Sequence, residues 1–243
     1  MKEERVILQD KGKTQLISHS GYKGGVQWPN TCAAFIISGT KEYYGIETDM
    51  HETKDGRFIL RHNIDVPNND GDMINIPETD FAELRKIRMI DRDGETVRED
   101  YFLPSLEEYI HICRAYDKQA ILELKSVRDI ANLANVVAIV RKMDWYERTT
   151  FISFNRDYLL FIHEKYPDTS AWLLSGVGDD ETLDFIIKHR LGANLQFKCV
   201  TKEKVDKLHA HGLPVGTYTV NKLDLAETLI SWGVDYITTD IIE

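Results

Sequence analysis

Apolar and polar positions along the chain predict strands and helices in regular succession. Short apolar runs predict eight strands, near residues 14–20, 44–50, 119–125, 149–154, 169–175, 193–198, 214–220 and 234–239. Between them, apolar positions at helical spacing predict helices near residues 30–41, 104–117, 128–144, 156–166, 179–190, 201–211 and 222–232. Strands separated by crossover helices form a parallel sheet, and eight such units in 243 residues favour an α/β fold of the (β/α)8 TIM barrel type over a doubly wound sheet.

One interval between the expected strands is much longer than the others. Most steps from strand to strand take about twenty to thirty residues, whereas the step from residue 50 to residue 119 is far longer. Residues 64–103 therefore look like an insertion between strands 2 and 3, rich in turn residues around one short helical stretch, Thr79–Ile87. We expect one domain, residues 1–243, whose insertion lies near the carboxyl end of the barrel and shapes access to a site there.

The second expected strand carries two acidic residues on one face. Glu47 and Asp49 are two positions apart, so their side chains point the same way. The next apolar run, Phe58–Leu60, follows too soon for a parallel crossover, so the two runs are expected to pair as an antiparallel ribbon. Residue 49 then lies opposite residue 61, to within about one residue, which brings His62 beside the acids. Taken alone, the pattern also fits a solvated strand face with a surface histidine.

Composition and charge narrow the possible partners. The chain has 42% apolar residues, enough for a sizeable core, and a formal net charge of −10 without a long basic cluster. These features favour a small-molecule substrate over nucleic acid or an anionic membrane surface. Cys32, Cys113 and Cys199 are odd in number and widely spaced, which disfavours a disulfide framework or a zinc site. Because no apolar signal region or membrane-length apolar run is present, we expect a cytoplasmic protein without stable membrane association.

Polar residues gather at the expected carboxyl ends of several strands, where the active sites of TIM barrels lie. His19 follows the first strand, Glu47 and Asp49 end the second, and Glu123 and Lys125 end the third. The three carboxylates form an all-oxygen ligand set, which suits one hard divalent cation, Mg²⁺ or Ca²⁺, better than zinc. The sequence therefore predicts a metal site made by Glu47, Asp49 and Glu123.

The remaining residues add acid–base and anion-binding groups. Histidine side chains such as His19 and His62 can transfer protons to and from oxygen, and Lys125 can hold a phosphate oxygen. Taken singly, Glu123 and Lys125 also fit a strand-end ion pair, and His19 a core histidine. Their joint occurrence at three strand ends predicts metal-assisted cleavage of a phosphodiester.

The order of motifs along the chain resembles the glycerophosphodiester phosphodiesterase family of the phospholipase-C-like phosphodiesterase superfamily. The matching segments span nearly the whole chain: His19–Gly21, Pro29–Thr31, Gly45–Met50, Thr53–Gly56, His62–Asn63, Leu103–Glu108, Leu122–Lys125, Ser153–Phe154, Thr219–Asn221 and Gly233–Asp240. The resemblance implies a metal ion bound by the three carboxylates, with His19 and His62 as the acid–base pair. It also implies that a glycerol hydroxyl of the substrate first attacks phosphorus, giving a cyclic phosphate that water then opens.

Several positions depart from the family pattern. Ser20 replaces an arginine that resembles a phosphate clamp, Pro29 stands where the family has glutamate, and Asn63 replaces the aspartate after the second histidine. Tyr218 stands where the family commonly has tryptophan, and we expect it to contact the substrate. Lys23 is a candidate for the missing positive charge, with a solvated lysine as the alternative.

These observations lead to one main hypothesis and two alternatives. The main hypothesis is metal-dependent hydrolysis of glycerophosphodiesters to an alcohol and sn-glycerol 3-phosphate, with His19 and His62 as catalytic residues and substrate contacts from Lys125, Lys23 and Tyr218. The first alternative, motivated by the departures, is a phosphoester-binding domain with weak or lost catalysis. The second is a lipid phosphodiesterase of the phospholipase type, which the lack of an amphipathic or basic membrane-docking stretch disfavours.

Overall fold

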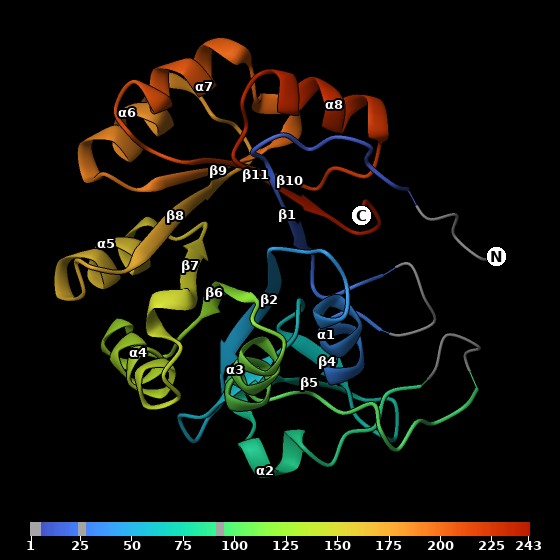
Figure 1. Ribbon diagram of the computed structural model, residues 1–243. Coiled ribbons are helices and arrows are strands. Elements are labelled where there is room, and N and C mark those ends of the chain that lie inside the picture. The colour runs from blue at the N-terminus through green and yellow to red at the C-terminus, as the bar shows by residue number, and fades with distance from the viewer. Residues whose placement is uncertain (1–5, 24–27, 91–94) are drawn as a thin grey trace.

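Eight parallel strands form a closed ring in the computed structural model (Figure 1), which describes residues 6–23, 28–90 and 95–243. The strands are β1 (Gln15–Ser18), β2 (Gly45–Glu52), β6 (Gln119–Ser126), β7 (Thr149–Ser153), β8 (Ser170–Ser175), β9 (Gly192–Gln196), β10 (Val215–Tyr218) and β11 (Tyr236–Thr239). They follow one another around the ring in this order, and β11 pairs with β1 to close it. Each strand lies within two residues of its expected bounds, which confirms the predicted (β/α)8 barrel.

The helices lie on the outside of this ring (Figure 1). The seven that cross between successive barrel strands are α1 (Cys32–Gly39), α3 (Leu106–Ala115), α4 (Leu133–Lys142), α5 (Arg156–Lys165), α6 (Asp180–His189), α7 (Lys202–His209) and α8 (Leu223–Ser231), counted over the described residues. Side chains fix several of their starts. At α3, the Glu108 backbone N–H donates to the Ser105 hydroxyl oxygen. In return, the Ser105 backbone N–H donates to the Glu108 carboxylate. Within the described ranges, no helix combines the length and apolar composition needed to span a membrane.

Apolar side chains fill the inside of the barrel below the carboxyl ends of its strands. Ile17, Ile121, Ile152 and Trp172 are buried there in one cluster. Gly192 makes room for the tryptophan, because a Cβ atom at that position would lie 2.0 Å from the Trp172 ring. The interior is therefore a packed core, and the strand ends above it have little freedom to move.

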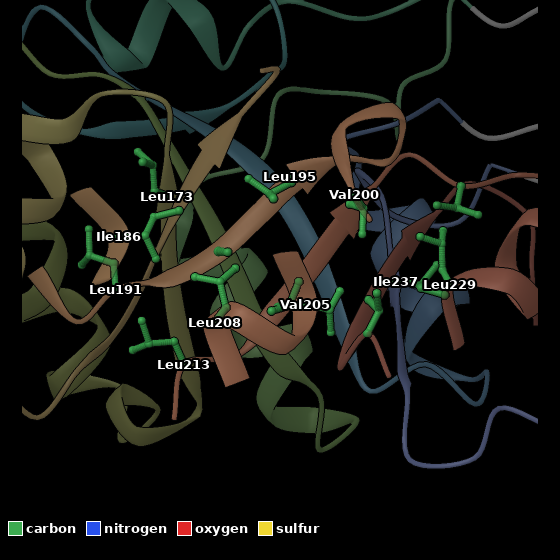
Figure 2. Close-up of a cluster of buried hydrophobic side chains, with 14 of the residues drawn as sticks. Leu173, Ile186, Leu191, Leu195, Val200, Val205, Leu208, Leu213, Leu229 and Ile237 are labelled. Atoms are coloured by element: carbon green, nitrogen blue, oxygen red, sulfur yellow. The ribbon is translucent and has the colours of Figure 1, made fainter. Parts of the chain in front are cut away.

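Two further apolar clusters join the ring to its helices. Figure 2 shows the one beneath α6, α7 and α8, where strand residues such as Leu173 and Ile237 pack with Ile186, Leu208 and Leu229 from the helices. The other cluster joins β2 and β6 to α3 and α4. Full burial of each such aliphatic side chain contributes about 1.5–3 kcal/mol to folding, so the two clusters hold the strands firmly in place.

An antiparallel strand extends the end of β2, as the sequence predicts. In this ribbon β3 (Phe58–Leu60) pairs with β2 so that Met50 lies opposite Leu60. The same register continues one residue further, where the Arg61 backbone N–H donates to the Asp49 carbonyl oxygen at 2.9 Å. The expected pairing of residues 49 and 61 is therefore confirmed.

The segment after the ribbon packs on the side of the barrel around a small core of its own. It forms a hairpin of β4 (Asp65–Pro67) and β5 (Met73–Asn75), a 3₁₀ turn at Ile76–Glu78 and the short helix α2 (Phe81–Leu84). Its apolar side chains, Val66, Ile76, Leu84 and Tyr101 among them, form a separate buried cluster. The hairpin was not predicted, whereas α2 lies within the expected helical stretch Thr79–Ile87. Part of the predicted turn region, residues 91–94, lies outside the described residues.

Candidate active site

Three buried carboxylates lie together at the carboxyl ends of β2 and β6. Asp49 pairs in register with Glu123, and Glu47 precedes Asp49 by two residues on the same face of β2. Each of the three side chains offers one oxygen atom, and these atoms all lie within 4.8 Å of one another. The structure thus brings together the three residues that the sequence nominates as metal ligands.

The charges of these carboxylates are poorly neutralised. Burial, together with the charges of Asp49 and Glu123, raises the pKa of Glu47 well above its ordinary value. Burial and Asp49 also raise the pKa of Glu123 to about 7, although Lys125 opposes the effect. Burial acts on Asp49 in the same direction, but Lys125 and the Asn30 amide outweigh it and hold the pKa of Asp49 below its ordinary value.

The donor set fits a hard divalent cation. Lys125 is the nearest cation to the cluster among the described residues, with its ammonium nitrogen 3.1 Å from Glu123 and 3.4 Å from Asp49. One ammonium group leaves three neighbouring carboxylates with an excess of negative charge, which adds to burial in raising the pKa values of Glu47 and Glu123. Because all the donors are oxygen atoms, Mg²⁺ or Ca²⁺ would satisfy this cluster better than a softer metal.

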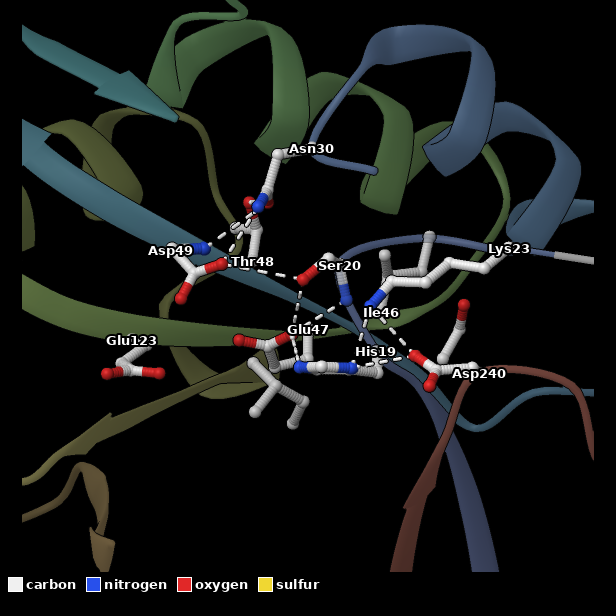
Figure 3. A network of polar contacts seen from close by, with 12 residues as sticks. His19, Ser20, Lys23, Asn30, Ile46, Glu47, Thr48, Asp49, Glu123 and Asp240 are labelled. Atoms are coloured by element: carbon white, nitrogen blue, oxygen red, sulfur yellow. Dashed lines mark hydrogen bonds and ion pairs between the residues drawn. The ribbon is translucent and has the colours of Figure 1, made fainter. Parts of the chain in front are cut away.

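The turn after β1 binds the carboxylates through its backbone (Figure 3). The Ser20 N–H donates to a Glu47 oxygen at 2.7 Å, and the Ser20 hydroxyl oxygen lies 3.4 Å from Asp49. The turn requires glycine at the next position: Gly21 has φ +77°, and a Cβ atom there would lie 2.7 Å from the Cβ of Ala34. The His19–Gly21 motif therefore orients Glu47 and at the same time directs His19 toward the site.

Asn30 orients the second carboxylate. Its side-chain amide donates to the Asp49 carboxylate at 2.8 Å, and its amide oxygen accepts from the Thr48 hydroxyl at 2.5 Å. The following residue, Thr31, caps α1 by accepting from the Ala34 N–H. The sequence motif Pro29–Thr31 is explained by these contacts, although sequence reasoning assigned Asn30 no role of its own.

His19 lies between Glu47 and a fourth carboxylate, that of Asp240 (Figure 3). Its Nδ1 atom is 2.8 Å from an Asp240 oxygen, and its Nε2 atom is 4.0 Å from Glu47. Burial tends to raise the pKa of Asp240, but the hydrogen bond from His19 and the charge of Lys23 lower it well below its ordinary value. Sequence reasoning missed Asp240, which follows the last strand, β11, and so obeys the same strand-end rule as the other candidates.

Lys23 lies on the far side of His19 from the three carboxylates (Figure 3). Its ammonium nitrogen is 2.8 Å from Asp240 and 2.9 Å from His19 Nδ1, and 23% of its side chain is exposed. Lys23 therefore forms an ion pair with Asp240 instead of being fully solvated. Its expected contact with the substrate stays a prediction.

A cavity of 220 Å³ opens above the carboxylates and is lined by His19, Glu47, His62, Glu123, Lys125, Ile152, Phe154, Leu174, Asn194, Tyr218, Thr219 and Thr238. Most of the candidate residues therefore face one space. His62 is exposed at its rim, and its Nδ1 atom lies 2.9 Å from the Asn63 side-chain oxygen. Tyr218 and Phe154 form an aromatic wall, with ring centres 6.1 Å apart and perpendicular planes.

The barrel and the groups around its cavity define the class of protein. A cluster of carboxylates with two histidines and a lysine at the carboxyl end of a TIM barrel suits phosphodiester hydrolysis, and the family and relatives of the chain show that it is an enzyme of this class, a phosphoric diester hydrolase. The chain belongs to the glycerophosphoryl diester phosphodiesterase family, whose model matches residues 19–243. The family membership that the sequence motifs predict is therefore confirmed.

Known relatives agree with this assignment over nearly the whole chain. Two glycerophosphodiester phosphodiesterases are similar to it in sequence: that of Bacillus subtilis (strain 168) is 23% identical over 92% of this chain and 82% of the relative, and that of Caldanaerobacter subterraneus subsp. tengcongensis is 25% identical over 94% of both. Among solved structures, a phosphodiesterase of Oleispira antarctica in complex with the product sn-glycerol-3-phosphate superposes with a TM-score of 0.82, at 22% identity and 93% coverage of each chain. Such a likeness shows a common fold.

Proposed function

We propose that this protein hydrolyses glycerophosphodiesters to an alcohol and sn-glycerol 3-phosphate. The observation that carries the proposal is a cluster of three carboxylates, two of which line one cavity together with Lys125 and two histidines, in a chain of the glycerophosphoryl diester phosphodiesterase family. The presence of sn-glycerol-3-phosphate as the product in the Oleispira antarctica structure supports the same substrate class.

Glu47, Asp49 and Glu123 would hold one divalent cation, Mg²⁺ or Ca²⁺. When bound, such a cation polarises a phosphoryl oxygen and offsets charge that builds up in the transition state. Ser20 and Asn30 prepare the ligands for this task, because each donates a hydrogen bond that fixes one carboxylate. Lys125 would bind a nonbridging phosphate oxygen at the edge of the same cavity.

The two histidines would move the protons. Asp240 lies 2.8 Å from His19 Nδ1 and would accept its N–H, which would fix the ring and leave Nε2 directed at the cavity. One histidine accepts the proton of the glycerol hydroxyl as its oxygen attacks phosphorus, and the other gives a proton to the departing alcohol as its P–O bond breaks. Water then opens the cyclic phosphate, with the two histidines in exchanged roles.

Turnover of defined substrates tests the proposal. Purified protein with Mg²⁺ or Ca²⁺ is given glycerophosphocholine, glycerophosphoethanolamine and glycerophosphoglycerol, and the release of sn-glycerol 3-phosphate is measured. We expect His19→Ala and His62→Ala each to lower kcat/KM by about 10²–10⁴-fold. His211→Ala is the matched control, since His211 is exposed beyond α7 and its ring lies within hydrogen-bond distance of the Lys207 carbonyl, away from the cavity.

The negative outcomes separate the alternatives. Absence of turnover on every diester with either metal would reject the proposal. If the product still bound tightly in that case, the phosphoester-binding alternative would hold instead. Cleavage confined to lysophospholipids in vesicles would support the lipid phosphodiesterase.

A further inference from the structure

Arg61 lies at the end of the β2–β3 ribbon, beside the candidate active site. Its backbone N–H donates to the carbonyl of Asp49, and residues paired in this way direct their side chains to the same face of an antiparallel ribbon. Arg61 therefore leaves the ribbon on the face that carries the Asp49 carboxylate. It also lines a second cavity, of 340 Å³, which is bordered by His19, Ser20, Lys23, Asn30 and His62.

The Arg61 guanidinium has no acidic partner among residues 6–23, 28–90 and 95–243. Its one side-chain hydrogen bond runs from Nη1 to the Met89 sulfur, a weak acceptor, at 3.3 Å. The side chain is partly buried, and burial lowers its pKa. The neighbouring arginines differ in this respect, because Arg57 and Arg85 are each paired with a glutamate.

A partly buried guanidinium without a carboxylate keeps its hydrogen-bonding capacity for a ligand. Its five N–H donors form a planar fork that matches the oxygens of a phosphate or a carboxylate. His19 and His62 line both this cavity and the one above the carboxylates, so the two spaces meet at the histidines. A phosphoester between the two imidazoles would have Lys125 on one side and Arg61 on the other.

We propose that Arg61 binds an anionic oxygen of the substrate. The inference rests on the proposed function, because it takes the anion from a phosphodiester held at this site. Two parts of such a substrate can carry an anionic oxygen: the phosphate that reacts, and an acidic group on the alcohol that leaves.

Three variants test the proposal. Arg61→Gln removes the charge, Arg61→Lys keeps a cation but loses the planar fork, and Arg57→Gln removes an equal charge from an exposed arginine outside both cavities. We measure the Kd of sn-glycerol 3-phosphate and of inorganic phosphate by calorimetry, and kcat/KM for glycerophosphocholine, glycerophosphoglycerol and glycerophosphoserine. Arg61→Gln is expected to lower kcat/KM by about 10- to 100-fold, mainly through KM, while Arg57→Gln has no effect.

The pattern of the losses identifies the anion. Equal losses on all three diesters, with a weaker Kd for sn-glycerol 3-phosphate and inorganic phosphate, place Arg61 on the phosphate. A loss confined to glycerophosphoserine places it on the head group. Unchanged Kd and KM values in Arg61→Gln overturn the proposal.

The binding measurement separates a failure of this inference from a failure of the proposed reaction. If the unaltered protein cleaves no diester, the Kd of sn-glycerol 3-phosphate still reports on Arg61, and only the reaction is rejected. If Arg61→Gln does not fold, Arg61→Lys is used instead. A Kd for sn-glycerol 3-phosphate that is weaker by about tenfold supports binding by the planar guanidinium, and an unchanged Kd overturns the proposal.

Discussion

Replacing Glu123 by glutamine is expected to stabilise the metal-free protein and to weaken metal binding. Burial and Asp49 raise the pKa of Glu123 from 4.5 to about 7 in the folded protein. A carboxyl group with a raised folded-state pKa favours folding below its unfolded pKa and loses that contribution as the pH rises through the folded value. The metal-free protein should therefore lose stability between about pH 4.5 and pH 7, and Glu123→Gln should remove this loss.

The size of the effect follows from the two pKa values. At 1.36 kcal/mol for each pKa unit, the interval from 4.5 to about 7 corresponds to about 3 kcal/mol at pH 8. The variant also loses the ion pair between Glu123 and Lys125, at 3.1 Å, which lowers the net gain. We expect a gain of about 1–3 kcal/mol at pH 8, or roughly 3–10 °C in Tm for a chain of this length.

Thermal unfolding in a chelator, at pH 5 and at pH 8, measures this gain. The variant should exceed the unaltered protein in Tm at pH 8 and match it more closely at pH 5. Excess Mg²⁺ or Ca²⁺ should then raise the Tm of the unaltered protein and have little effect on the variant. Glu181→Gln is the control: Glu181 is exposed and paired with Arg156 in solvent, so its loss should leave the Tm nearly unchanged at both pH values.

A Glu123→Gln variant that is less stable than the unaltered protein in chelator at pH 8 would contradict this expectation. Such a result would mean that Lys125 already neutralises the carboxylates and that they have no need of a cation. A gain of equal size at pH 5 and pH 8 would also contradict the argument, because it would show that the charge of Glu123 is not its cause.

Two further variants test how the turn after β1 and the end of β11 support the site. Asp240→Asn should lower kcat by about 10- to 100-fold without a change in metal affinity, because Asp240 fixes the His19 ring; kinetics with a parallel metal titration checks this. Gly21→Ala should destabilise the protein by about 1–3 kcal/mol in urea unfolding, since its Cβ atom would meet Ala34 at 2.7 Å. Gly12→Ala, also at positive φ but with nothing within 4 Å, should cost about 1 kcal/mol or less.

The barrel could be predicted because its signal is repeated along the chain. Each barrel strand except the last is a run of four to eight residues with a helix before the next barrel strand, and the same alternation recurs until the ring closes. The hairpin of β4 and β5 could not be predicted in the same way. Its strands have three residues each, and only β4 alternates in burial, so the turn between them is the one feature that the sequence pattern indicates.

The same distinction applies to the candidate site, where some residues could be predicted from the local sequence and others could not. Glu47, Asp49 and Glu123 follow from strand ends and a period of two, both of which are local properties of the sequence. The contact of Asp240 with His19 joins residues 221 positions apart, so no spacing rule reveals it. Local patterns therefore predict the candidate metal ligands, whereas the pairing of Asp240 with His19 is seen only once the chain is folded.

The balance of charge explains how the chain tolerates serine at position 20. Three ionised carboxylates and a phosphodiester carry four negative charges, whereas Lys125 and a divalent cation supply three positive ones. Lys23 does not make up the difference, because Asp240 already pairs with it. Arg61 lines the second cavity without a carboxylate partner among the described residues, and it follows β3, whereas the turn with Ser20 follows β1. On this view the positive charge has been moved to another strand end, and the site can stay neutral when metal and substrate are both bound.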